Sequence, residues 1–97
     1  MDQAALQRIR QAVIDNRHRL TFHAEQELAM DHLIVVDAES ALLTGDIARI
    51  EPDAPDQPGP RYTVIGTATD QLTKVGIVCR FEIENRLLII TCYHIDP

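Results

Sequence analysis

Two apolar segments separated by a short polar step dominate the C-terminal third of the chain. Residues 74–83 and 86–95 are rich in Val, Ile, Leu and Phe, and Glu84-Asn85 lies between them. Asn tolerates the positive φ that a tight hairpin turn requires. The pattern therefore predicts two antiparallel strands joined at Glu84-Asn85, and this hairpin is the centre of the expected fold.

A two-residue turn also fixes the expected register of the hairpin. The cross-strand pairs would be Phe81–Leu88, Cys79–Ile90, Ile77–Cys92 and Val75–His94. Because strand side chains alternate between faces, one face would be a core of Val75, Ile77, Cys79, Phe81, Leu88, Ile90, Cys92 and His94. The other face would carry Lys74, Gly76, Val78, Arg80, Glu82, Leu87, Ile89, Thr91 and Tyr93. This second face is half apolar, which suits a surface that is partly covered or bound.

The first half of the chain has helical periodicity. Residues 3–16 place an apolar stripe on one side of a helix, formed by Ala5, Leu6, Ile9, Ala12 and Val13. A second helix is expected over residues 23–30, with Thr21 as its N-cap. Asp37 is expected to cap a third helix over residues 38–43, which Thr44-Gly45 closes.

Shorter extended segments follow these helices. Residues 48–51 alternate like an edge strand, the proline-rich residues 52–60 form a polar loop, and residues 61–69 predict a further strand. The fold class is therefore α+β, with N-terminal helices packed on an antiparallel sheet of about four strands. We expect residues 1–97 to form a single domain.

Length and composition limit the classes of protein to which the chain can belong. A chain of 97 residues buries about two-thirds of its unfolded surface without disulfides or metals. It has no apolar run long enough to cross a membrane, so we expect a cytoplasmic protein without a membrane partner. In the expected register Cys79 and Cys92 are diagonal neighbours, so we expect buried free thiols.

The net charge of −6 is unevenly distributed. Residues 1–24 hold four arginines against two acids, whereas residues 25–60 hold nine acids against Arg49 alone. Proteins that bind phosphates need clustered Lys and Arg. A nucleic-acid contact would therefore fall on the first helix or on the sheet.

The strong motifs of catalysis and metal binding are absent, and we expect no cofactor. The most suggestive spacing is that of His23, Glu27 and Asp31, which share one stripe of the second helix. Such a stripe could hold a divalent metal, or Glu27 could orient His23 as a base. It is also typical of the polar side of a short surface helix, with acids near its N-terminus.

A second candidate site lies on the predicted sheet. Tyr93 shares its face with Arg80 and Thr91, a set that could bind an oxyanion or stack a nucleobase. Arg61 and Tyr62, at the start of a strand, could serve the same surface. A polar rim around a half-buried sheet would have the same pattern.

Four short segments resemble a known bacterial family, the domain of unknown function 4258. They are Thr21-Phe22-His23-Ala24, Thr44-Gly45-Asp46-Ile47, the residues at 58–62, and Ile89 to Tyr93 with Asp96-Pro97. The resemblance covers about residues 19–97. This family is grouped with the RelE/ParE-like toxins, compact α+β proteins whose catalytic members cut RNA and whose genes pair with antitoxins.

The resemblance implies a weak or degenerate metal-independent ribonuclease. His23 would be its general base or acid, Arg80 and Tyr93 would steady phosphate or base, and the RNA 2′-hydroxyl would be the nucleophile. Arg61, Tyr62 and Thr91 would bind the RNA, and a cognate antitoxin would be the protein partner.

The chain departs from this family where relatives carry two arginines on the stripe after the histidine. Here those positions are Glu27 and Asp31, whose charges repel a phosphodiester. The alternative is therefore a non-catalytic module that binds a partner chain through its sheet.

Overall fold

The protein folds into three helices and one mixed β-sheet. The computed structural model describes residues 3–52, 55–56 and 59–96. The helices are α1 (Gln3–Ile14), α2 (Phe22–Met30) and α3 (Val35–Thr44). The strands are β1 (His18–Leu20), β2 (Asp46–Glu51), β3 (Arg61–Thr67), β4 (Lys74–Phe81) and β5 (Leu87–Ile95), with the 3₁₀ turn η1 (Ile83–Asn85) before β5. The α+β class is confirmed.

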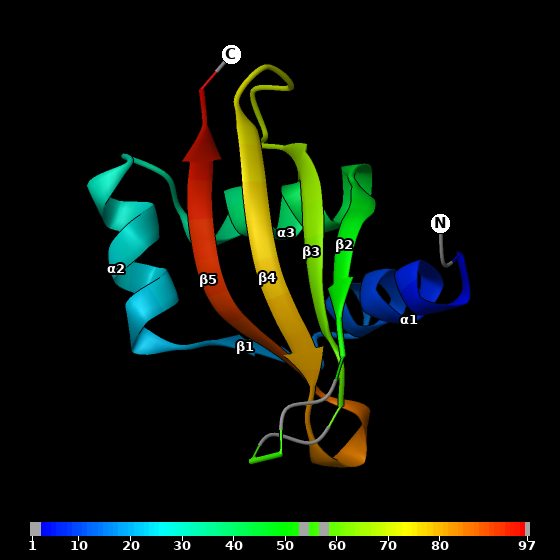
Figure 1. The fold of residues 1–97 in the computed structure, drawn as a ribbon. Helices are drawn as coiled ribbons and strands as arrows, with labels where there is room; N and C mark the ends of the chain where they lie inside the picture. The colour runs from blue at the N-terminus through cyan, green and yellow to red at the C-terminus, as the bar shows by residue number, and fades with distance from the viewer. Residues whose placement is uncertain (1–2, 53–54, 57–58, 97) are drawn as a thin grey trace.

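The sheet has five strands in the order β1-β5-β4-β3-β2 (Figure 1). The prediction of about four antiparallel strands missed β1, which pairs in parallel with β5. Its three residues are too few to show a strand period, and the cations around His18 resemble a helix end. All other neighbouring strands pair antiparallel, and β2 is an edge strand as predicted.

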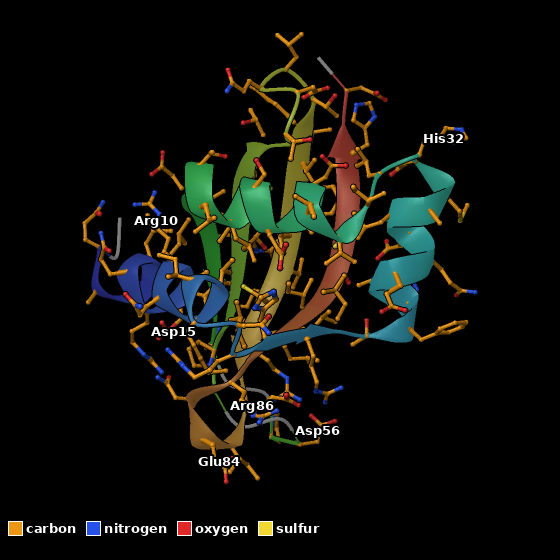
Figure 2. The ribbon with its side chains drawn as sticks, turned by 180° about the vertical axis from the view of Figure 1, so that it is seen from behind. Arg10, Asp15, His32, Asp56, Glu84 and Arg86 are labelled. Atoms are coloured by element: carbon orange, nitrogen blue, oxygen red, sulfur yellow. The ribbon has the colours of Figure 1, made fainter. Side chains whose placement is uncertain are left out.

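Helices α1 and α3 cover one face of the sheet, while α2 lies along the free edge of β5 (Figure 1). Seen from behind, α1 and α3 lie in front of the strands (Figure 2). The predicted stripe of α1 is buried against this face, together with core residues of β3, β4 and β5. Each buried Leu or Ile contributes about 1.5–3 kcal/mol, so this layer supplies most of the stability.

The hairpin is confirmed, but half of its predicted register is wrong. Ile77–Cys92 and Val75–His94 pair as expected, whereas Phe81 faces Leu87 and Cys79 faces Ile89. A β-bulge at Ile90 causes the difference, because one extra residue in β5 exchanges the faces of the residues before it. Leu87 and Ile89 are therefore in the core, and Leu88 lies on the opposite face.

The helix ends are partly as predicted. Thr21 caps α2, since its side-chain oxygen accepts the Ala24 N–H at 3.0 Å. Helix α3, however, starts earlier than expected, with Ile34 as its N-cap residue. Asp37 lies one turn inside the helix, and its carboxylate accepts the Ile34 N–H at 3.0 Å. Gly45 is the C-cap of α3.

The remaining structural expectations concern the cysteines, the loop and the membrane. Cys79 and Cys92 are buried free thiols, and burial raises the pKa of each to about 12. Part of the predicted loop over residues 52–60, namely 53–54 and 57–58, lies outside the described residues. None of the described helices is long and apolar enough to span a membrane.

Candidate functional site

The candidate site is the face of the sheet opposite α1 and α3, which we call the open face. No helix in the described part of the chain covers it (Figure 1). The strand register places the Gly76 backbone on it, together with the side chains of Arg19, Leu88, Thr91, Tyr93, Val78, Arg80, Thr63, Ile65, Arg61, Arg49 and Glu51. Arginines gather at the end of this face near η1, and hydroxyl and apolar side chains follow toward the other end.

One row of side chains crosses all five strands at the arginine-rich end. Arg19 of β1 and Arg80 of β4 both pair with Leu88 of β5. Arg61 precedes Tyr62, which pairs with Cys79, so Arg61 falls opposite Arg80. Glu51 pairs with Arg61 and completes the row. The fold thus brings together arginines from three separate parts of the sequence.

The outer arginines of this row are neutralised by acids. Arg19 makes a two-pronged ion pair with Glu82, at 2.7 and 3.0 Å, and these hydrogen bonds hold the pKa of Glu82 below its usual range. Arg61 lies 3.3 Å from a carboxylate oxygen of Glu51. Exposed pairs of this kind contribute little stability, but they hold the guanidinium groups in place.

Arg80 differs from both neighbours. It is half-buried on the central strand β4, and it makes no hydrogen bond or ion pair with any residue that the structure describes. The charge of Arg80 acts on Glu82 and, after the Arg19 hydrogen bonds, helps to lower the pKa of that carboxyl. The N–H groups of Arg80 still donate to no described acceptor, so they are available to an external anion.

Tyr93 provides a flat aromatic surface further along the open face. It pairs with Gly76, and a Cβ on Gly76 would lie only 2.5 Å from Cε2 and 2.6 Å from the hydroxyl oxygen of Tyr93. The ring therefore lies over the glycine backbone, while the residue remains 37% exposed. The accessible side of the ring can stack a planar ligand.

The His23 stripe borders this face along the free edge of β5. His23 Nε2 lies 3.2 Å from Glu27 Oε1, and the same oxygen accepts the Cys92 backbone N–H at 3.0 Å. Glu27 thus caps an unpaired donor of β5 and orients the imidazole of His23, whose side chain is 67% exposed. This is the base-and-orienter arrangement of general acid–base sites.

A small hollow of about 160 Å³ joins the stripe to the open face. It is lined by Glu27, Met30, Asp31, Cys92 and Tyr93. Although the stripe could have held a metal by its spacing, no three His, Cys, Asp or Glu side chains among the described residues are grouped to hold a metal ion.

The structure brings most of the predicted site residues to one surface. Arg80, Thr91, Tyr93 and Arg61 lie on the open face, and His23 lies at its border. Tyr62 does not, because it pairs with Cys79 on the core face and is 7% exposed. Its assignment to RNA binding is therefore corrected.

Spacing within the site limits its chemistry. By the register and ordinary strand dimensions, the Cα atoms of Arg80 and Thr91 are about 8 Å apart, and those of Arg80 and Tyr93 about 14 Å apart. Arg80 and Tyr93 thus suit separate parts of an extended ligand. Sequence reasoning missed Arg19 because β1 was not predicted, and its three residues are too few for alternation to reveal a strand.

The fold and site define a small α+β protein whose open sheet face carries a row of arginines across its strands. A histidine–carboxylate pair lies at the border of that face. The family model for the domain of unknown function 4258 (DUF4258) matches residues 20–94. This covers more than half of the chain, so the protein belongs to that family. No curated protein and no solved structure matches it.

Proposed function

We propose that this protein is a RelE/ParE-like, toxin-type protein that binds single-stranded RNA across its open face and cleaves it weakly without a metal. The observation that carries the proposal is Arg80, an unpaired guanidinium at the centre of that face. Threonines and Tyr93 extend the surface along the sheet, as in single-strand binders that combine cations with a stacking ring.

Cleavage would use His23 as the base. Its imidazole takes the proton of a 2′-hydroxyl, whose oxygen then attacks the adjacent phosphorus. The bond from phosphorus to the 5′-oxygen breaks, a 2′,3′-cyclic phosphate forms, and water returns a proton to the leaving oxygen. Glu27 stabilises the imidazolium formed in this step. Arg80 lies on the other side of β5 from α2, so it would bind phosphate oxygens elsewhere along the RNA strand. The reaction is weak because His23 is exposed to water.

The test uses a short fluorescent single-stranded RNA in EDTA at two salt concentrations. Arg80→Ala is expected to weaken binding about tenfold at low salt and to reduce the salt slope by about one. His23→Ala is expected to keep the affinity and lower the cleavage rate by about 100-fold. Arg86→Ala is the matched control, since Arg86 lies at the hairpin end outside the row (Figure 2) and its charge, like that of Arg80, also acts on Glu82. Unchanged binding by Arg80→Ala, or cleavage that persists in His23→Ala, would contradict the proposal.

A partner chain is the second candidate, but through a different surface from the sheet. Ile14, Val36 and Leu43 are exposed beside a hollow of about 390 Å³ between α1 and α3, which Glu39 also lines. Such a groove fits the apolar side of an amphipathic helix. The acid excess of residues 25–60 favours a helix flanked by basic residues.

This candidate is tested by co-expression with the product of the adjacent gene. If that product supplies the basic helix, the two chains are expected to co-elute in size exclusion, and Ile14→Asp is expected to separate them. Phe22→Asp is a matched control, since Phe22 is also largely exposed, and it lies at the start of α2, away from the groove. A complex that survives Ile14→Asp would exclude the groove as the interface.

A further inference from the structure

The hollow between α2 and Tyr93 has walls of three chemical kinds. The ring of Tyr93 forms an aromatic wall, the side chain of Met30 an apolar one, and the carboxylates of Glu27 and Asp31 an acidic one. Met30 is 80% exposed, so its thioether is accessible to a bound ligand. Met is a soft residue that adapts to planar ligands. An aromatic ring, a thioether and a carboxylate around one small hollow suit a single nucleobase.

Asp31 is at the wrong end of its helix for stability. It is the C-cap residue of α2, and the last turn contains no basic residue. A negative charge there is disfavoured by the helix dipole. Its carboxylate makes no hydrogen bond or ion pair with any described residue, whereas Glu27 is already engaged by Cys92 and His23. His32, the next residue, points outward from the end of α2 (Figure 2) and does not line the hollow.

We infer that this hollow is a guanine-binding subsite, with the base stacked on Tyr93 and its Watson–Crick edge read by Asp31. Guanine is the only common RNA base with two adjacent N–H donors on that edge, N1–H and the N2 amino group. They match the two oxygens of one carboxylate, as a guanidinium does. The acidic stripe, which repels phosphate, is thus suited to a base edge.

This inference deepens the proposed function and rests on it, but it can be tested without RNA. The four ribonucleoside 5′-monophosphates and inosine monophosphate are titrated into the labelled protein, and amide shifts of Asp31 and Tyr93 are followed by NMR. The dissociation constant of guanosine monophosphate is expected to be at least about tenfold lower than those of the other nucleotides. Inosine monophosphate, which keeps N1–H but lacks the N2 amino group, is expected to lose most of that advantage.

Two variants separate reading of the base from stacking. Asp31→Asn is expected to bring the four nucleotides within about twofold of each other, because an amide presents a donor to guanine where the carboxylate presents an acceptor. It should also raise the melting temperature, since the unfavourable helix-end charge is removed. Gly76→Ala displaces the Tyr93 ring. It is expected to weaken the binding of all nucleotides without changing the order of their affinities.

The outcomes distinguish this inference from the proposed function. Equal binding of all nucleotides, or a guanine preference that survives Asp31→Asn, overturns the subsite. Guanine preference in nucleotides with no binding of single-stranded RNA overturns the proposed function and leaves the subsite standing. RNA binding that depends on Arg80 but not on the presence of guanine overturns the subsite and leaves the proposed function standing.

Discussion

Replacing Gly66 by alanine is expected to destabilise the protein more than the same methyl addition at Gly76, elsewhere in the sheet. Gly66 lies on the core face of β3, directly beneath α3. A Cβ at this position would overlap the carbonyl oxygen of Ala41 and lie 2.8 Å from its carbonyl carbon and 2.9 Å from its Cα. All three atoms belong to the helix backbone, so α3 as a whole must move away from the sheet.

The cost of that movement exceeds ordinary overpacking, because no rotamer change can relieve it. We expect a loss of about 3 kcal/mol or more, which is a large part of the stability of a small domain. The melting temperature should fall by about 15 °C or more. Thermal unfolding followed by circular dichroism measures this.

Gly76→Ala is the matched control for Gly66→Ala. It makes the same change in the neighbouring strand, but the new Cβ would meet only the end of the Tyr93 side chain. That ring can rotate into solvent, so the expected change in melting temperature is a few degrees at most. Equal destabilisation by the two variants would show that loss of glycine in the sheet, not contact with α3, is what matters.

The sequence predicted the elements that are long enough for their hydrophobic period to repeat several times. The apolar stripe of α1 and the two long strands of the hairpin each repeat several times, so their type was predicted correctly. The bulge at Ile90 was not predictable, since a continuous apolar run from Leu87 to Ile90 reads equally well in either register. What decides the register is the anchoring of β1 and Thr21 to Ile89 and Ile90.

The sequence predicted those parts of the candidate site whose face follows from the alternation of side chains along a strand. Arg80, Thr91 and Tyr93 share a face because β4 is regular and because the bulge in β5 precedes Thr91. The role of Glu27 could not be predicted, because the Cys92 N–H that it accepts is 65 residues away in sequence. From the sequence, Glu27 was an orienter for His23, a metal ligand or a lost cation, whereas the structure also gives its carboxylate a capping role on β5.

Asp37 accounts for the second large expected effect. It is 8% exposed, and one oxygen accepts the Ile34 N–H at 3.0 Å. The other accepts the Thr69 N–H at 3.0 Å and the Thr69 hydroxyl at 2.7 Å. These bonds join the start of α3 to the loop after β3. They hold the pKa of Asp37 below its usual range, the Thr69 hydroxyl most of all, and they outweigh burial and the nearby Asp70.

The sign of the pH dependence follows from this lowered pKa. Because the carboxyl binds a proton more weakly in the folded state, its stabilisation is complete above the unfolded pKa of about 3.9 and is lost as the pH falls through the folded value. At neutral pH, Asp37→Ala is expected to cost about 3 kcal/mol, because it leaves two backbone donors and a hydroxyl without their charged acceptor. Asp37→Asn should cost about 2 kcal/mol, since its amide still accepts from Thr69 but presents a donor to Ile34.

Urea unfolding at a series of pH values tests both the size of these stability losses and the sign of the pH dependence. Between about pH 5 and pH 2 the stability of the parent protein should fall more steeply than that of Asp37→Asn, because the variant has no proton to take up at this site. Thr69→Val is the matched probe from the other side of the contact. It removes only the hydroxyl, so it should cost about 1 kcal/mol at neutral pH and make the acid slope shallower. If Asp37→Asn kept the full slope of the parent, the acid sensitivity would belong to other carboxylates, and the link between α3 and the loop after β3 would not depend on the charge of Asp37.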